Sequence, residues 1–151
     1  MKFIILLLFI LSDVVCAKPT TVAPMPLGDI NPNVTQENIY STVCVPNYSK
    51  SIRPKSSYTN KLKLKQMQQF NLSGLPSDYE EDHFISLSLG GHPTSENNLW
   101  PQYELGNSGA LKKDKLETFL HSQLCKNKIS LKQAQLEVGK DWYKYYKKYK
   151  L

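Results

Sequence analysis

The sequence predicts an α+β domain in which a β-hairpin is followed by packing helices, and three patterns carry this prediction. Residues 84–89 alternate apolar and polar side chains as a strand does, stop at Gly90-Gly91, and are followed by a second strand at Asn98-Leu99-Trp100. From residue 108 to about 128, apolar residues recur at the spacing of one helix face. Ser130, with Gln133 three residues later, is typical of a capping box that begins a last helix.

The segment before this hairpin carries weaker patterns. Residues 43–48 predict a short strand around Cys44. Thr59 can cap a helix over residues 60–70, although the alternation of residues 62–65 also fits a strand; we favour the helix.

The N-terminus predicts a processed leader. Residues 1–17 combine Lys2, an apolar run over residues 3–11 and a small-residue end at Val15-Cys16-Ala17, which is typical of a signal peptide cut after Ala17. That run is too short to cross a bilayer of about 30 Å, so stable membrane insertion is not expected, with an uncleaved anchor as the alternative. Residues 18–38 are rich in proline and predict an extended linker, which leaves residues 39–151 as a single domain of a secreted or periplasmic protein.

Composition and charge narrow the class of protein. A hydrophobic share of 40% indicates a globular chain, and the net charge of +6 suits an anionic partner. The sequence contains no Walker loop, Rossmann glycine pattern, nucleophile elbow or zinc-type Cys/His spacing.

The cysteines predict one disulfide. If Cys16 leaves with the leader, Cys44 and Cys125 form an even pair in an oxidising compartment. The alternative is two separately buried thiols.

The acidic group that ends in His83 is the best candidate for chemistry. Glu80-Glu81-Asp82-His83 is costly to bury without a purpose. At a strand edge, Asp82 can reach a divalent cation while the His83 imidazole, which we expect to face solvent, removes a proton from a nucleophile. Alone, the pair is weak evidence, because such pairs are common on solvated edges.

The longer pattern strengthens this interpretation. The stretch Asp82-His83-Phe84-Ile85-Ser86-Leu87-Ser88-Leu89-Gly90-Gly91, followed by Asn98-Leu99, resembles the ββα-metal core of the HNH (His-Me finger) nucleases. The resemblance covers residues 80–117, and the flanking residues are similar to a group of small secreted bacterial proteins that carry this core.

The resemblance implies roles for individual residues. His83 would be the general base, Asp82 a metal ligand, and Asn98 the residue that holds the loop so that the His83 ring keeps its orientation. The third position is open between Asn107, which we prefer, and Asp114. The implied cofactor is a divalent ion, with Mg²⁺ preferred and Mn²⁺, Ni²⁺ or Zn²⁺ as alternatives. Many family members brace this core with CxxC zinc ligands, which this chain lacks, so the Cys44–Cys125 bridge would take over that bracing.

Two functions therefore fit the sequence. The first is a secreted, metal-dependent endonuclease that hydrolyses DNA or RNA with little sequence specificity, its partner being the phosphate backbone; an inhibitor protein is left unassigned. The second is a non-catalytic module of the same shape that binds a polyanion or a protein. The Trp142–Leu151 segment is either a core stripe of Trp142, Tyr146 and Tyr149 or a base-stacking surface. Six lysines are expected to attract phosphate without reading bases: Lys61, Lys63, Lys65, Lys112, Lys113 and Lys115.

Overall fold

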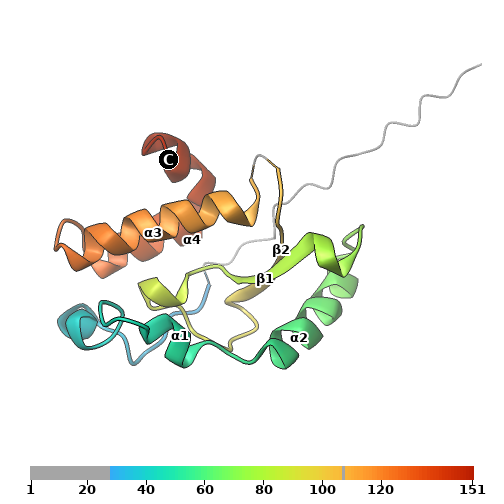
Figure 1. The fold of residues 1–151 in the computed structure, drawn as a ribbon, viewed down its shortest axis with the longest axis horizontal. Coiled ribbons are helices and arrows are strands. Elements are labelled where there is room, and N and C mark those ends of the chain that lie inside the picture. Colours follow the sequence, from blue (N-terminus) through green and yellow to red (C-terminus); the bar gives the residue numbers. More distant parts are fainter. Residues whose placement is uncertain (1–27, 107) are drawn as a thin grey trace, which may run out of the picture.

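The computed structural model describes residues 28–106 and 108–151. The predicted signal peptide, most of the predicted linker and Asn107 therefore lie outside the described residues. The α+β class with a hairpin and packing helices is confirmed (Figure 1). In chain order the elements are α1 (Tyr48–Ile52), α2 (Ser56–Gln69), β1 (Tyr79–His83), β2 (Leu99–Tyr103), α3 (Ala110–Cys125) and α4 (Leu131–Lys148), with short 3-10 turns at Gln36–Ser41, Pro76–Asp78 and Leu87–Leu89.

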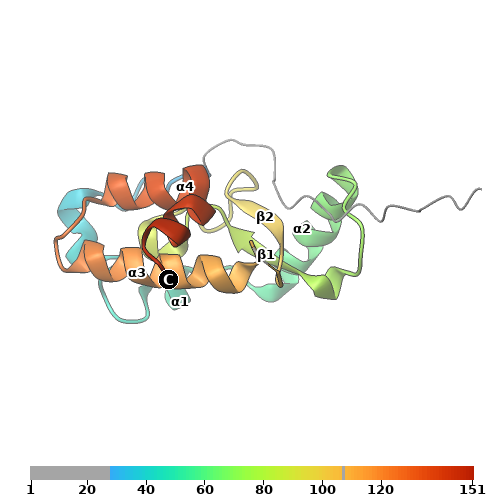
Figure 2. The ribbon, with the colours of Figure 1, turned by 90° about the horizontal axis from the view of Figure 1, so that it is seen from above.

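The hairpin lies between the α3–α4 pair and α2 (Figures 1 and 2). Strand β1 pairs antiparallel with β2, and Tyr79 lies opposite Tyr103 and His83 opposite Leu99. Because side chains alternate along a strand, Glu81 and His83 share one face of β1 and Asp82 lies on the other. Gln66 of α2 donates a hydrogen bond to the Leu99 carbonyl, whereas the face of Asp82 meets α3.

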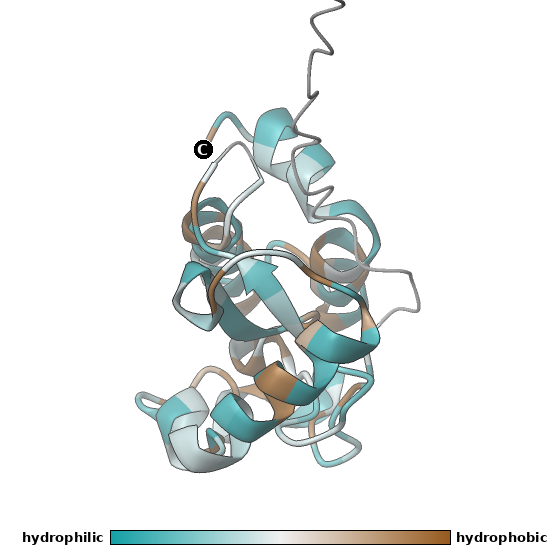
Figure 3. Cartoon of the chain, turned by 90° about the vertical axis from the view of Figure 1, so that its right-hand side faces the viewer, coloured by the Kyte–Doolittle hydropathy of each residue, from teal (hydrophilic) through white to brown (hydrophobic). Residues whose placement is uncertain are grey.

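The hydrophobic core is centred on the packed faces of α3 and α4. It contains Leu116, Leu120 and Leu124 of α3, Ala134 and Val138 of α4, and Val34, Ile39, Val43, Ile85 and Leu89 from the loops. Hydrophilic residues cover much of the ribbon in Figure 3, with hydrophobic positions in short patches. As predicted, the Ser130 hydroxyl caps α4 by accepting a hydrogen bond from the Gln133 backbone N–H.

The first strand lies earlier than expected. Residues 79–83 form the strand, while residues 84–89 form a loop that ends in the Leu87–Leu89 turn. Ile85, Leu87 and Leu89 are all buried, so their alternation reflects burial within a loop and not strand pairing. Gly91 is required here, because a Cβ at this position would lie 1.7 Å from the Ile85 carbonyl oxygen.

Two other expectations are corrected before the hairpin. Residues 43–47 form turns and Tyr48 begins α1, so this segment is not a strand; Val43 is buried while Val45 is exposed. The α2 helix begins at Ser56, ahead of the expected cap at Thr59, since Pro54 fixes an extended entry.

The packed domain also extends beyond Ile39 toward the N-terminus. Val34 is 5% exposed within the core, and the Asn31 backbone N–H donates to the Gly90 carbonyl at 2.8 Å. Residues 28–38 are therefore part of the fold and not a linker.

The predicted disulfide is confirmed. Cys44 and Cys125 are bonded, with their Cα atoms 5.6 Å apart and 81 residues apart in sequence. The bridge ties the turn after the first 3-10 helix to the C-terminal end of α3, beside the core. No helix within the described residues is long and apolar enough to cross a membrane.

Candidate functional site

Asp82 makes an ion pair with Lys113 of α3. The Lys113 Nζ atom lies 2.7 Å from Asp82 Oδ2, and the same ammonium donates to the His83 carbonyl oxygen at 2.7 Å and to Glu117 Oε1. An ammonium has three N–H donors, so these three acceptors satisfy it completely.

Lys113 was expected on the surface, and this expectation is wrong. Its side chain is 1% exposed. Burial alone would lower the pKa of Lys113, but Asp82 and Glu117 raise it above its ordinary value, so the buried lysine is charged. The spacing of Lys113 and Glu117, one helical turn apart, was the available signal in the sequence.

His83 is buried, whereas we had expected a solvent-facing ring. It is 3% exposed, and its Nε2 atom lies 3.0 Å from the Pro93 carbonyl oxygen. Because a carbonyl oxygen only accepts, Nε2 carries the proton in the neutral ring and Nδ1 keeps its lone pair. Burial lowers the pKa of His83, so the imidazole is neutral at neutral pH.

Asn98 fixes the loop that carries this carbonyl. Its Oδ1 accepts from the Ile85 backbone N–H at 2.9 Å, and its Nδ2 donates to the carbonyls of Ile85 at 3.0 Å and of His92 at 2.9 Å. Asn98 is fully buried, and all three contacts are to backbone. Asn98 therefore holds His92, the residue before Pro93, in place. The Pro93 carbonyl in turn accepts the hydrogen bond from the His83 ring.

A polar pocket of about 370 Å³ opens beside His83. It is bordered by α2 and β1, and its lining includes Arg53, Lys63, Glu80, Glu81 and His83. The Lys63 ammonium donates to the carbonyls of Pro76 and Tyr79 and so holds α2 to the hairpin.

Arg53 was missed by the sequence analysis. It is the only arginine in the chain, which was the available signal. Its side chain is exposed, and within the described residues no hydrogen bond or ion pair occupies its guanidinium. A guanidinium at a pocket edge is suited to a phosphate, which it can bind through two parallel hydrogen bonds.

Glu81 contributes little negative charge to the pocket, because its carboxyl group is mainly protonated at neutral pH. Burial raises the pKa of Glu81 to about 8, against the effect of Lys63 and with added repulsion from Asp82 and Glu96. Both carboxyl oxygens are buried without a hydrogen-bond partner within the described residues. At neutral pH this side chain is therefore mainly protonated.

The expected oxygen ligands do not converge within the described part of the chain. Asp114 is exposed on α3, and burial and then the charge of Asp82 raise its pKa, so the two carboxylates repel each other. Asp82, His83 and Asp114 do not form a group with donor atoms within 4.8 Å of one another, and Asn107 lies outside the described residues. With one Asp82 oxygen bonded to Lys113, the described residues do not fit the expected metal.

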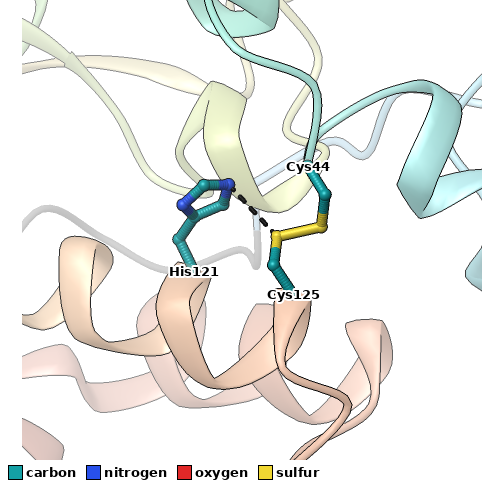
Figure 4. A group of neighbouring side chains, drawn as sticks. All are labelled: Cys44, His121 and Cys125. Atoms are coloured by element: carbon teal, nitrogen blue, oxygen red, sulfur yellow. Dashed lines mark hydrogen bonds between the residues drawn. A yellow bond between two sulfur atoms is a disulfide. The ribbon is translucent and has the colours of Figure 1, made fainter.

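A different group brings three donors together. Cys44, His121 and Cys125 have ligand atoms within 4.8 Å of one another and could hold a metal ion (Figure 4). The two sulfurs form the disulfide, and His121 Nε2 lies 3.4 Å from Cys125 Sγ and 2.8 Å from the Val43 carbonyl oxygen. Because metals bind thiolates, this group would need the bridge to be reduced first.

The remaining candidates have structural roles. His92 Nδ1 accepts hydrogen bonds from the backbone of Thr94 and Ser95 and so shapes a turn. In the C-terminal segment, Trp142 and Tyr149 pack on the core as predicted, as does Tyr145 in place of Tyr146. Tyr146 stacks on Tyr143, whose ring also carries the Lys147 ammonium at 4.6 Å.

Comparison with protein-family models, with curated proteins and with solved structures finds no match to this chain.

Proposed function

We propose that the protein is a nuclease that hydrolyses phosphodiester bonds of DNA or RNA in the pocket beside His83. The observation that carries this proposal is the state of the His83 ring. Its Nε2 is occupied by the Pro93 carbonyl, its Nδ1 is left as an acceptor, and burial lowers its pKa so that it is neutral. A positioned neutral imidazole at the edge of a polar pocket is suited to general-base catalysis.

In the proposed reaction, His83 Nδ1 takes a proton from a water molecule as the water oxygen attacks phosphorus. The bond between phosphorus and the leaving oxygen breaks, and the leaving oxygen takes a proton from solvent. Arg53 would bind a non-bridging phosphate oxygen and stabilise the charge that builds up there. Asn98, through the loop that it fixes, would keep the ring oriented.

The Mg²⁺ that the sequence predicts is not used in these steps. Such an ion would require Asp82 together with Asn107 or Asp114, and one oxygen of Asp82 is already bonded to Lys113. The proposed hydrolysis therefore depends on the chain's own residues.

The charge and the disulfide support an extracytoplasmic nucleic-acid partner. A net charge of +6 favours a polyanion, and a disulfide is stable in an oxidising compartment. We therefore propose secretion or a periplasmic location, with recognition of the phosphate backbone and not of the bases.

Plasmid DNA and a long RNA, incubated with purified protein in buffer with Mg²⁺ or with EDTA, test the proposal. His83→Gln is the decisive variant, because a glutamine can still donate to the Pro93 carbonyl but cannot act as a base. We expect cleavage by the wild type and a loss of roughly 10²–10⁴-fold in the variant. No cleavage by the wild type, or equal cleavage by both, would refute the proposal.

The second candidate function is a non-catalytic module that binds a polyanion. The Asp82–Lys113 pair favours it, because the first expected metal ligand is already paired with a buried ammonium. Retention of nucleic acid on the protein without any cleavage would identify this function.

A further inference from the structure

The buried ammonium of Lys113 lies among oxygen atoms of the kind that bind divalent cations. Its three acceptors are two carboxylate oxygens and one backbone carbonyl oxygen, from Asp82, Glu117 and His83. Hard divalent cations prefer this set of ligands. The ammonium is therefore a single positive charge in a position that a metal ion could otherwise take.

Competition between Lys113 and a free metal ion strongly favours the lysine. The ammonium is covalently attached to α3, on the face of the helix that is turned toward the core. Its binding therefore costs no translational entropy, whereas a free ion loses translational entropy when it binds from solution. Displacing it would leave a charged side chain that is 1% exposed without acceptors, which is costly.

We infer that Lys113 is the permanent cation of the Asp82 site and excludes divalent metal from it. Lys113 is a positioning residue: it fixes the Asp82 carboxylate and the backbone at His83, and it does not touch the pocket. The inference extends the proposed function, since it makes any hydrolysis at His83 independent of divalent metal. Its main readout, however, is metal binding and does not depend on activity.

Mn²⁺ titration followed by electron paramagnetic resonance tests the inference directly. We expect the wild type to bind no Mn²⁺ at Asp82 up to millimolar concentration. In Lys113→Ala, the vacated space retains both carboxylates and should bind one Mn²⁺, with a rise in melting temperature on adding the ion. Asp82→Asn in the Lys113→Ala background should abolish that binding.

Lys115→Ala is the matched control, because it removes an exposed lysine of the same helix and leaves the ammonium in place. It should bind no more Mn²⁺ than the wild type. If Lys113→Ala does not fold, the wild-type titration still decides: binding that disappears in Asp82→Asn overturns the inference. A folded Lys113→Ala that binds no Mn²⁺ also overturns it.

The cleavage assay separates this inference from the proposed function. Wild-type cleavage that is unchanged by EDTA supports both. Cleavage that EDTA abolishes and Mg²⁺ restores overturns the inference but not the nuclease. If no cleavage occurs, the nuclease proposal fails, and the Mn²⁺ titration still decides the role of Lys113.

Discussion

The side-chain amide of Asn98 binds both backbone polar groups of Ile85, accepting from its N–H at 2.9 Å and donating to its carbonyl at 3.0 Å. Asn98 thereby does for the loop after β1 what a neighbouring strand would do in a sheet, and it satisfies groups that would otherwise be buried unpaired.

Asn98 substitutions should therefore destabilise the domain in a defined order. Asn98→Ala leaves backbone groups unpaired and should lower the free energy of unfolding by about 2–4 kcal/mol. Asn98→Asp should cost more, because a carboxylate oxygen would face the carbonyl oxygens of Ile85 and His92 where an N–H₂ now donates. Urea denaturation measures both.

Asn97→Ala is the control for this comparison. Asn97 is exposed and its amide makes one long bond, 3.3 Å, to Asp29, so we expect a change within about 0.5 kcal/mol. If Asn98→Asp is as stable as the wild type, the loop is not held by the hydrogen bonds that the Asn98 Nδ2 group donates.

Local patterns predicted α2, α3, α4, the second strand and the disulfide, because each rests on spacing within the chain or on cysteine number, whereas α1 was not predicted. The position of the first strand was wrong, since Ile85, Leu87 and Leu89 are buried in a loop that does not pair with a strand, and Ser86 between them is buried as well. An alternation of apolar and polar residues in the sequence cannot by itself distinguish a strand from such a loop. Here the backbone of Ile85 bonds to the side chain of Asn98.

The site was predicted less well than the fold. The sequence drew attention to His83 and Asn98, but it placed Lys113 among the surface lysines. Within Lys112-Lys113-Asp114-Lys115, only the spacing of Lys113 to Glu117 singles out one lysine, and that spacing does not show whether the pair faces solvent or β1. The pocket beside Arg53 likewise forms only once α2 is packed on the hairpin.

The pH dependence of cleavage should report the buried state of His83. Its pKa is lowered from the ordinary value of 6.5 by burial, so the neutral, basic form persists as the pH falls below 6.5. We expect the acidic limb of the kcat/KM profile to have its midpoint below pH 6.5. A midpoint at or above that value would contradict the role of a buried, uncharged base.

Glu81 should make the domain less stable as the pH rises. Its folded pKa, about 8, lies above its ordinary value of 4.5, so the native state binds more protons and loses stability between these two values. Glu81→Gln cannot ionise and keeps the size of the side chain. In thermal unfolding from pH 5 to pH 9, the melting temperature of the variant should rise relative to that of the wild type as the pH increases.

Glu104→Gln serves as the control for that experiment, because Glu104 lines the same pocket but is exposed. A gain with pH in Glu81→Gln that Glu104→Gln does not share would assign the effect to the buried carboxyl of Glu81. A difference in melting temperature between Glu81→Gln and the wild type that stays constant from pH 5 to pH 9 would show that Glu81 ionises normally in the folded protein.

The Cys44–Cys125 bridge should contribute substantially to stability. A bridge that closes a loop of 81 residues stabilises by about 4 kcal/mol on chain-entropy grounds. The double variant Cys44→Ala/Cys125→Ala should lose most of this in urea denaturation. A reductant should weaken the wild type to a similar extent and leave the double variant unchanged, and thiol titration of the denatured wild type without reductant should detect neither cysteine.

Arg53 should contribute to binding of the phosphate backbone through bidentate contact as well as through charge. We expect Arg53→Ala to weaken nucleic-acid affinity more than Lys55→Ala, which removes one charge from an exposed position nearby. Arg53→Lys should recover only part of the loss, because an ammonium cannot make the two parallel bonds of a guanidinium.

Fluorescence anisotropy with a labelled oligonucleotide, repeated over a series of salt concentrations, measures the affinity of each variant and its dependence on salt. Affinity should fall steeply with salt, and the slope should be smaller in Arg53→Ala, since one fewer counterion is released. Equal losses in Arg53→Ala and Lys55→Ala would reduce Arg53 to a general surface charge, and binding that does not change with salt would remove the phosphate backbone as the ligand of this pocket.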